Sequence, residues 1–186
     1  MKMSFLSLCF SALLLLASCT KEEVSASGSN QNAYDYSAPV NVIASDWISA
    51  SLNWSNAPAA SNNALQTYWS AGVNQEIINK GVVLIYAKDQ SSGSIKSFPA
   101  RFDFNDNDFD SYSSVVEPYS IQLVHSRYRN GQYITPVKND NISFRYILIE
   151  NAAYGSIQTG SGGEVSVGSL KYMSYDDVVS LLGIDK

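Results

Sequence analysis

The chain has 186 residues, of which 45% are hydrophobic and 16% charged, a composition that suits a globular domain with a hydrophobic core. Its 12 basic and 17 acidic residues give a formal charge of −5, and the basic residues form no run. The charge pattern therefore argues against a nucleic-acid partner and against binding to anionic lipid by charge.

The first predicted element is a cleaved signal peptide over residues 1–18. Lys2 supplies a positive charge, and residues 5–17 form an apolar run shorter than the ~20 residues of a transmembrane helix. The following Leu-Ala-Ser-Cys, residues 16–19, resembles the lipobox of bacterial lipoproteins, in which the cysteine is lipidated and becomes the new N-terminus. The resemblance implies that Cys19 anchors the protein to a membrane that it does not span. The alternative is an ordinary secretory signal with an incidental cysteine.

Cleavage before Cys19 would also remove Cys9, the only other cysteine. The mature domain would then hold no free thiol and no disulfide, which excludes cysteine catalysis, thiolate metal sites and redox motifs.

Residues 19–38 are predicted to form a flexible tether after the lipidated cysteine. This stretch is rich in Ser, Asn and Gln and poor in aliphatic residues, so it cannot bury enough surface to fold. Its Lys21-Glu22-Glu23 resembles the surface-export signal of Bacteroidota lipoproteins, which implies display on the outer face of the cell outer membrane. Residues 39–186 are then expected to form a single β-rich domain.

Most of the domain is predicted to be β-strand. The apolar run 81–88 is typical of a central strand covered on both faces, and residues 119–128 alternate, with Ile121, Leu123 and His125 on one side. Pro99 places its strand at a sheet edge or bulge, and Asn130-Gly131 predicts a hairpin turn. The expected strands cover residues 40–54 (one bent strand or two short ones), 81–88, 94–102, 119–128, 142–150 and 165–170.

Two short helices are predicted. Residues 73–81 end in Lys80-Gly81, a basic last turn followed by a helix-stopping glycine. The second helix lies within residues 174–186, where Ser174 and Asp177 form a capping box. Its buried stripe is expected to contain Val178, Leu181 and Leu182.

These elements predict a mainly β fold, an antiparallel β-sandwich of immunoglobulin-like or jelly-roll-like type with two short helices. A β-barrel or an α+β arrangement is the alternative.

The order of several segments resembles small uncharacterised Bacteroidota (Bacteroides-type) cell-envelope lipoproteins. The stretches that carry the likeness are NVIASDWISASLNW, NKGVVLIYAK, FRYILIEN and MSYDDVVSLLGIDK. The chain departs from that pattern at residues 150–152, where those proteins often have Pro-Gly-Gly. The resemblance implies a cell-envelope location and adds no catalytic residue.

An acidic stretch, RFDFNDNDFD, is the main candidate for chemistry. Asp103 and Asn105 match early ligand positions of an EF-hand loop, but Asp108 stands where that loop needs glycine and Ser114 where it needs glutamate. A looser Ca²⁺ site is one hypothesis, and a solvated loop held by phenylalanines or a catalytic carboxylate pair are the others. The candidate Ca²⁺ ligands are Asp103, Asn105, Asp106, Asp108 and Asp110.

Aromatic residues supply the second candidate site, because 12 tyrosines and 3 tryptophans exceed the needs of a small core. On an exposed sheet face such rings can stack on sugars or form a protein interface. The candidate ligand-binding aromatics are Tyr68, Trp69, Tyr112 and Tyr119, with ordinary core packing as the alternative. His125, the only histidine, is expected to be a strand residue satisfied by a neighbour.

Together these features favour a lipid-anchored cell-surface protein that binds a glycan or an envelope protein and catalyses no reaction. One alternative is a structural or assembly subunit of an outer-membrane complex or appendage. Another is an enzyme with an unrecognised carboxylate site, for which a deep acidic cleft would be the sign.

Overall fold

A computed structural model describes residues 41–50, 55–56, 62–136, 141–150, 155–158 and 162–185. The predicted signal peptide, Cys19 and the tether lie outside these residues, as do residues 40 and 51–54 of the first predicted strand. Within the described part, no helix is long and apolar enough to cross a membrane. The strands are β1 (Val42–Ala44), β2 (Ile48–Ser49), β3 (Ser55–Asn56), β4 (Asn63–Trp69), β5 (Val82–Asp89), β6 (Ile95–Ser97), β7 (Ala100–Asn105), β8 (Asp108–Glu117), β9 (Ser120–Arg129), β10 (Gln132–Ile134), β11 (Ile142–Ile149), β12 (Ser156–Gln158) and β13 (Glu164–Ser166). The helices are α1 (Gln75–Lys80), the 3₁₀ helix η2 (Val167–Tyr172) and α2 (Tyr175–Leu182).

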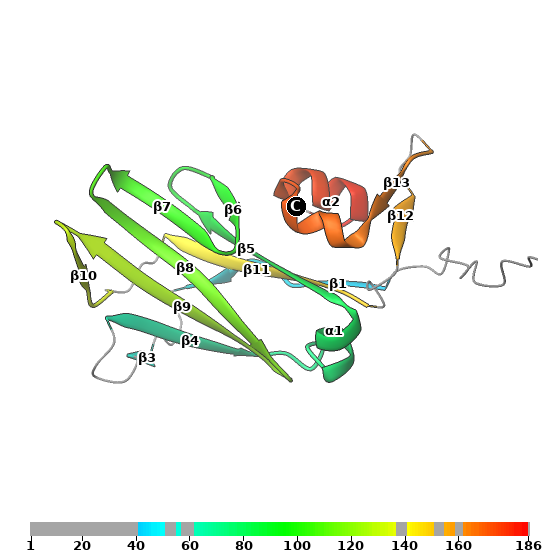
Figure 1. Cartoon of the computed structure of the whole chain (residues 1–186), viewed down its shortest axis with the longest axis horizontal. Coiled ribbons are helices and arrows are strands. Elements are labelled where there is room, and N and C mark those ends of the chain that lie inside the picture. The colour runs from blue at the N-terminus through cyan, green and yellow to red at the C-terminus, as the bar shows by residue number, and fades with distance from the viewer. Residues whose placement is uncertain are drawn as a thin grey trace, which may run out of the picture. The chain divides into compact units, whose positions relative to one another are not determined.

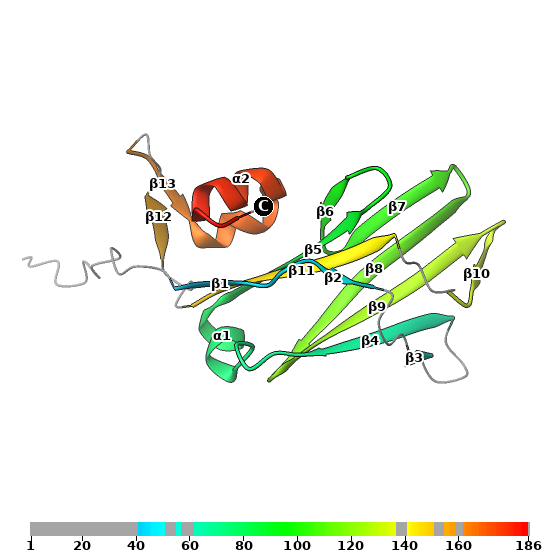
Figure 2. The ribbon, with the colours of Figure 1, turned by 180° about the vertical axis from the view of Figure 1, so that it is seen from behind.

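The fold is a β-sandwich of two antiparallel sheets, as the sequence predicts. One sheet has the order β1-β11-β5-β6, with β2 also paired to β11, and the other has the order β3-β4-β9-β8-β7, with β10 paired to β9 (Figure 1). Segments distant in sequence become neighbours, since Val42 on β1 pairs with Ile149 on β11. From behind, β1 and β2 run along β11 (Figure 2). A two-stranded sheet, β12-β13, precedes the last helices.

The main core lies between the two sheets. Ile121 and Leu123 of β9 are each 1% exposed, and they belong to the same buried cluster as Phe144 and Leu148 of β11. The rings of Phe144 and Tyr112, from opposite sheets, meet at 5.6 Å. The side of the strand that the alternation of residues 119–128 predicts to be apolar is therefore the side buried between the sheets.

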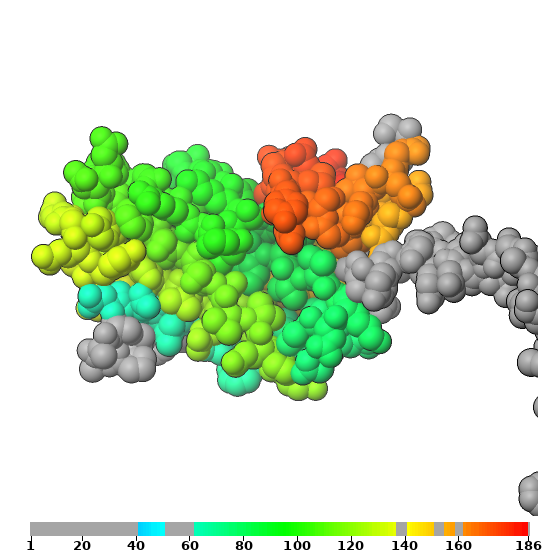
Figure 3. Space-filling model, viewed as in Figure 1, coloured from blue at the N-terminus to red at the C-terminus, as the bar shows by residue number. Residues whose placement is uncertain are grey.

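A third layer covers the outer face of the β11-β5 sheet. Leu84 and Ile147 point to this side and pack with Leu170 of η2 and Val178 of α2 in a second buried cluster. In the space-filling view the segment from η2 to α2, orange to red, packs directly on the green strand residues (Figure 3). Because both faces of β5 are covered, its sequence is a continuous apolar run.

Both predicted helices are present, and their ends have physical causes. The Asn74 side chain accepts from the N–H of Ile77 at 2.9 Å and caps α1. Gly81 follows because a Cβ there would lie 2.7 Å from the carbonyl oxygens of Ile77 and Ile149. Ser174 accepts from Asp177 N at 3.2 Å, the expected cap of α2, and Gly183 ends this helix in the left-handed conformation.

The predicted buried stripe of α2 is correct in part. Val178 is fully buried, as expected, and Tyr175 and Val179, which the pattern did not single out, are also buried. Leu181 and Leu182 are only half-buried against this cluster.

Several segments depart from the sequence prediction. The predicted strand 165–170 is a strand only up to Ser166, because the 3₁₀ helix η2 begins at Val167, and the predicted strand 94–102 divides into β6 and β7, which belong to different sheets. β4 was not expected, and β8 begins inside the acidic stretch that was interpreted as a loop. The stretch is a hairpin in which only Asp106 and Asn107 form the turn between β7 and β8. Phe104, expected to hold a loop to the core, is 59% exposed, whereas Phe102 is buried.

The strand register defines two ends of the sandwich, which we call proximal and distal. At the proximal end lie Asn41, Val42, Trp69, Tyr119 and α1, since Val42 and Val82 both pair with Ile149. At the distal end lie the β5-β6, β7-β8 and β9-β10 turns and the start of β11, where Ile142 pairs with Asp89.

Candidate functional site

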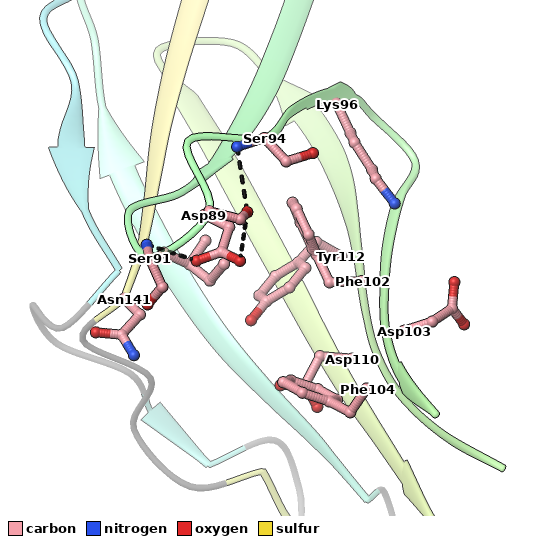
Figure 4. Close-up of a pocket in the computed structure, with 12 residues that line it drawn as sticks. Asp89, Ser91, Ser94, Lys96, Phe102, Asp103, Phe104, Asp110, Tyr112 and Asn141 are labelled. Carbon is pink, nitrogen blue, oxygen red and sulfur yellow. Dashed lines mark hydrogen bonds between the residues drawn. The ribbon is translucent and has the colours of Figure 1, made fainter. Parts of the chain in front are cut away.

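A cleft of about 370 Å³ opens between the two sheets at the distal end. The β5-β6 hairpin borders one side, and β7 and β8 border the other (Figure 4). In this view the carboxylate of Asp89 and the hydroxyl of Tyr112 face the same space, with the ring of Phe104 beside it. This distal cleft joins aromatic rings to hydrogen-bonding groups, as ligand pockets do.

The hairpin wall of the cleft is fixed by Asp89. Its carboxylate accepts from Ser91 N and Ser92 Oγ, each at 2.8 Å. The turn closes at Gly93, whose φ of 72° favours glycine. Burial opposes the charge, but the hydrogen bonds from Ser91 and Ser92 outweigh it and hold the pKa of Asp89 below its usual value.

An ionic cluster surrounds Asp110, which lines the cleft, and its other members are His125, Arg127 and Arg129. Cross-strand pairing of β8 and β9 sets Asp110 opposite Arg127, whose Nε and Nη2 each donate to the carboxylate at 2.8 Å. Arg129 Nη2 donates at 3.1 Å, and His125 Nε2 lies 3.5 Å away. Asp110 is 0% exposed.

Asp110 is held as a carboxylate. Burial favours its neutral form, but hydrogen bonds from Arg127 and His125, followed by their charges, hold the pKa of Asp110 well below its usual range. The same contact with Asp110 raises the pKa of Arg127. Such a group accepts hydrogen bonds and donates none at neutral pH.

His125 is a buried strand residue with neighbours, as expected. Its ring stacks on Tyr112, with the centroids 4.4 Å apart and the planes at 15°. Tyr112 is only 1% exposed, so this predicted ligand-binding aromatic borders the cleft from within the core. The stack continues the ionic cluster into the sandwich interior.

The mouth of the cleft is aromatic and cationic. The Arg129 guanidinium lies 4.5 Å from the centroid of the Phe104 ring. Lys96 Nζ donates to the carbonyl of Arg101 at 2.5 Å and lies 5.0 Å from the Phe102 ring. Lys96 thereby covers the outer edge of β7, a common way to protect an edge strand.

The candidate Ca²⁺ ligands do not converge. Asp103 accepts from Arg101 Nε at 2.6 Å, and Asp108 accepts from Asn105 Nδ2 and Asn130 N. The N–H of Asn130 first, and then Asn105, lower the pKa of Asp108. Asp106 lies in the turn, and Asp110 belongs to the ionic cluster.

Across the described ranges, no group of three or more His, Cys, Asp or Glu side chains is placed to hold a metal ion. Calcium binding stays a prediction, for calorimetry to test.

The other predicted aromatics lie at the proximal end. Trp69 is 81% exposed and Tyr119 is 58% exposed, whereas Tyr68 is half-buried and donates its hydroxyl to Ser49 O at 3.3 Å. Burial raises the pKa of Tyr68 to about 12, although a hydrogen bond with Gln66 acts in the opposite direction. Two of the aromatics singled out from the sequence, Trp69 and Tyr119, are therefore exposed, but they do not lie beside the cleft.

An aromatic group on the outer face of β8, β9 and β10 was not predicted. Phe109 stacks on Tyr128 at 4.9 Å, and Tyr133 meets Tyr128 edge-on at 5.1 Å. Arg101 lies 3.8 Å from the Phe109 ring centroid. No sequence pattern marks this group, since its members come from three strands that pair only in the fold.

Comparison with known proteins gives no match to a family model, a curated protein or a solved structure.

Proposed function

We propose that this protein is a lipid-anchored cell-envelope protein of the Bacteroidota type, displayed at the outer membrane, whose domain binds a glycan at the distal cleft without catalysis. The lipobox-like residues 16–19 and the following Lys-Glu-Glu support the anchor and its location. The observation that carries the proposal is the cleft itself, which lies at the end of the sandwich away from Asn41, where the chain enters.

The chemistry of the cleft favours a polyhydroxylated ligand. Phe104 offers a ring that is 59% exposed, and sugars stack their apolar faces on such rings. Asp89 and Tyr112 point at the adjacent space, and the hydrogen bonds of Ser91 and Ser92 fix the Asp89 carboxylate. A volume of about 370 Å³ is within the range of small-ligand pockets.

The same groups favour binding over proton transfer. A general acid in glycoside hydrolysis needs a carboxyl whose pKa is raised. Asp89 and Asp110, two of the carboxylates that border the cleft, have lowered pKa values because they accept hydrogen bonds. Both are therefore unsuited to protonating a leaving group, and Asp89, the less buried of the two, is suited to orienting a hydroxyl group.

A glycan array screened with the full chain tests this function, followed by calorimetry on the best glycan. We expect Phe104→Ala to weaken binding at least about tenfold, or about 1.4 kcal/mol. Tyr172→Ala is the matched control, since this ring is 81% exposed on η2, away from the cleft, and should leave the affinity unchanged.

Two results would contradict the proposal. An array without a hit would exclude a glycan ligand. A hit that Phe104→Ala binds as tightly as the unaltered chain would show that the ligand lies elsewhere.

A further inference from the structure

Three exposed apolar residues gather at the proximal end, and we call them the proximal patch: Ile43, Trp69 and Tyr119. They are 39%, 81% and 58% exposed. Ser70 N donates to Tyr119 O at 2.9 Å, which fixes the Tyr119 backbone beside the end of β4. A Cβ on Gly72 would lie 3.8 Å from Ile43 Cδ1, so Ile43 approaches the same β4-α1 connection.

Tyr119 occupies a backbone position that favours a smaller residue. Its φ is 67°, in the left-handed region, and it follows Pro118 in the turn between β8 and β9. Glycine or asparagine is the usual residue at such a turn position, and a bulky side chain there costs free energy. The ring of Tyr119 is nevertheless exposed to solvent at this turn.

The predicted lipid anchor that precedes the domain suggests which surface the proximal patch contacts. The proximal patch lies at the same end of the sandwich as the start of β1, since Asn41 and Val42 directly precede Ile43. The 21 residues between Cys19 and Asn41, if they form the predicted tether, would span about 25 Å. A lipid on Cys19 would thus hold the patch at a high effective concentration near the bilayer.

We infer that the proximal patch rests on the neutral headgroup layer of the membrane that holds the anchor, an inference that depends on the proposed lipidation. Tryptophan and tyrosine favour this layer because each joins an apolar ring to a polar tip.

Nearby charges exclude an anionic surface as the preferred one. Glu117 and Glu150 lie at this end, and Glu76 is paired with Lys80 at 3.6 Å. Net acidic surroundings are repelled by anionic lipid. The surface that fits the proximal patch is therefore a zwitterionic one.

Trp69 provides the probe. The lipidated full chain with Trp47→Phe and Trp54→Phe, which leaves Trp69 as the only tryptophan, is reconstituted in phosphatidylcholine vesicles. We expect its emission to shift to shorter wavelength, and brominated phosphatidylcholine to quench it, whereas Cys19→Ala removes both effects. The matched control carries Trp69→Phe and Tyr172→Trp in addition, which moves the tryptophan to an equally exposed site, and should not be quenched.

The outcomes separate the anchor from the patch. A chain that does not sediment with vesicles overturns the lipid anchor and this inference together. A chain that sediments, but whose Trp69 emission matches that of Cys19→Ala, overturns only the patch. Stronger quenching after addition of phosphatidylglycerol would overturn the zwitterionic preference.

Trp47 packs on Tyr175 at 5.4 Å, so its replacement could unfold the chain. In that case Trp69→Phe alone is compared with the unaltered lipidated chain. The inference requires that brominated lipid quench the unaltered chain more strongly.

Discussion

The proximal and distal halves of the sandwich interior are filled by opposite chemistry. Toward the proximal end the sheets enclose Val73, Ile77, Ile121 and Leu148, each at most 1% exposed. Toward the distal end they enclose Asp110 and His125, with the arginines of β9 beside them. The inward face of one strand, β9, changes from isoleucine and leucine to histidine and arginine along its length.

This difference shows that one half of the sandwich interior can serve stability while the other half borders a candidate binding cleft. Apolar burial holds the sheets together without directional demands, so the proximal interior can be tightly packed. Buried charges need partners in fixed geometry, and Asp110 obtains them from two arginines. The distal sheets therefore part around the ionic cluster and leave a cleft.

The proximal core should respond most strongly to mutation. We expect Leu148→Ala to lower the free energy of unfolding by about 4 kcal/mol, because a fully buried leucine leaves a cavity between two sheets. Urea denaturation measures the loss. Val115→Ala, at a position 46% exposed, is the control and should change stability by less than about 0.5 kcal/mol. Equal losses would mean that the proximal interior is not the main core.

Mutation of the ionic cluster should cause the second largest loss of stability. Asp110→Asn leaves Arg127 and Arg129 without their carboxylate, and we expect a loss of about 3 kcal/mol at neutral pH. The pKa of Asp110 is lowered in the folded state, so its stabilisation is fully present above about pH 4 and is lost as the pH falls further. The difference between the two proteins in urea denaturation should therefore shrink below pH 4. A difference that grows on acidification would contradict an ionised Asp110.

Elements whose sequence pattern matches their burial could be predicted from the sequence. β5 begins with a continuous apolar run and β11 is mostly apolar, because sheet and helix layers cover them, and α2 carries its own cap at Ser174. β8 was missed because its pattern is inverted. Its inward positions include Asp110, while Phe109 points outward, so hydrophobic alternation fails.

The site was only partly predictable for the same reason. Asp110 was singled out as a surface metal ligand, but its partners lie on the next strand, 17 and 19 residues away. Register sets those contacts, and local composition does not encode it. Of the four candidate ligand-binding aromatics, Trp69 and Tyr119 are exposed, and the other two are half-buried or buried. The cleft needs Asp89 and Phe104 together, which only the fold provides.

The N-terminal cap of α1, at the proximal end, should contribute less to the free energy of unfolding than the core or the ionic cluster. Asn74→Ala removes the acceptor for Ile77 N, and we expect a loss of about 1 kcal/mol, because this side chain satisfies an N–H group that has no partner within the first turn of α1. Asn79→Ala, in the same helix, is the matched control, since it removes only an exposed contact with Gln75. Thermal unfolding compares the two, and a control that loses as much would argue against the cap.

The smallest effect is expected at the distal surface, where Asp103 pairs with Arg101. The atoms are 2.6 Å apart, as close as any contact of Asp110, yet both side chains are about half exposed, at 52% and 53%. Water already solvates these charges, so Asp103→Asn should cost between about 0 and 1 kcal/mol, and added salt should remove the difference. Urea denaturation at low and high salt checks this. If Asp103→Asn and Asp110→Asn destabilise the domain equally, burial is not what distinguishes the ionic cluster from the surface around it.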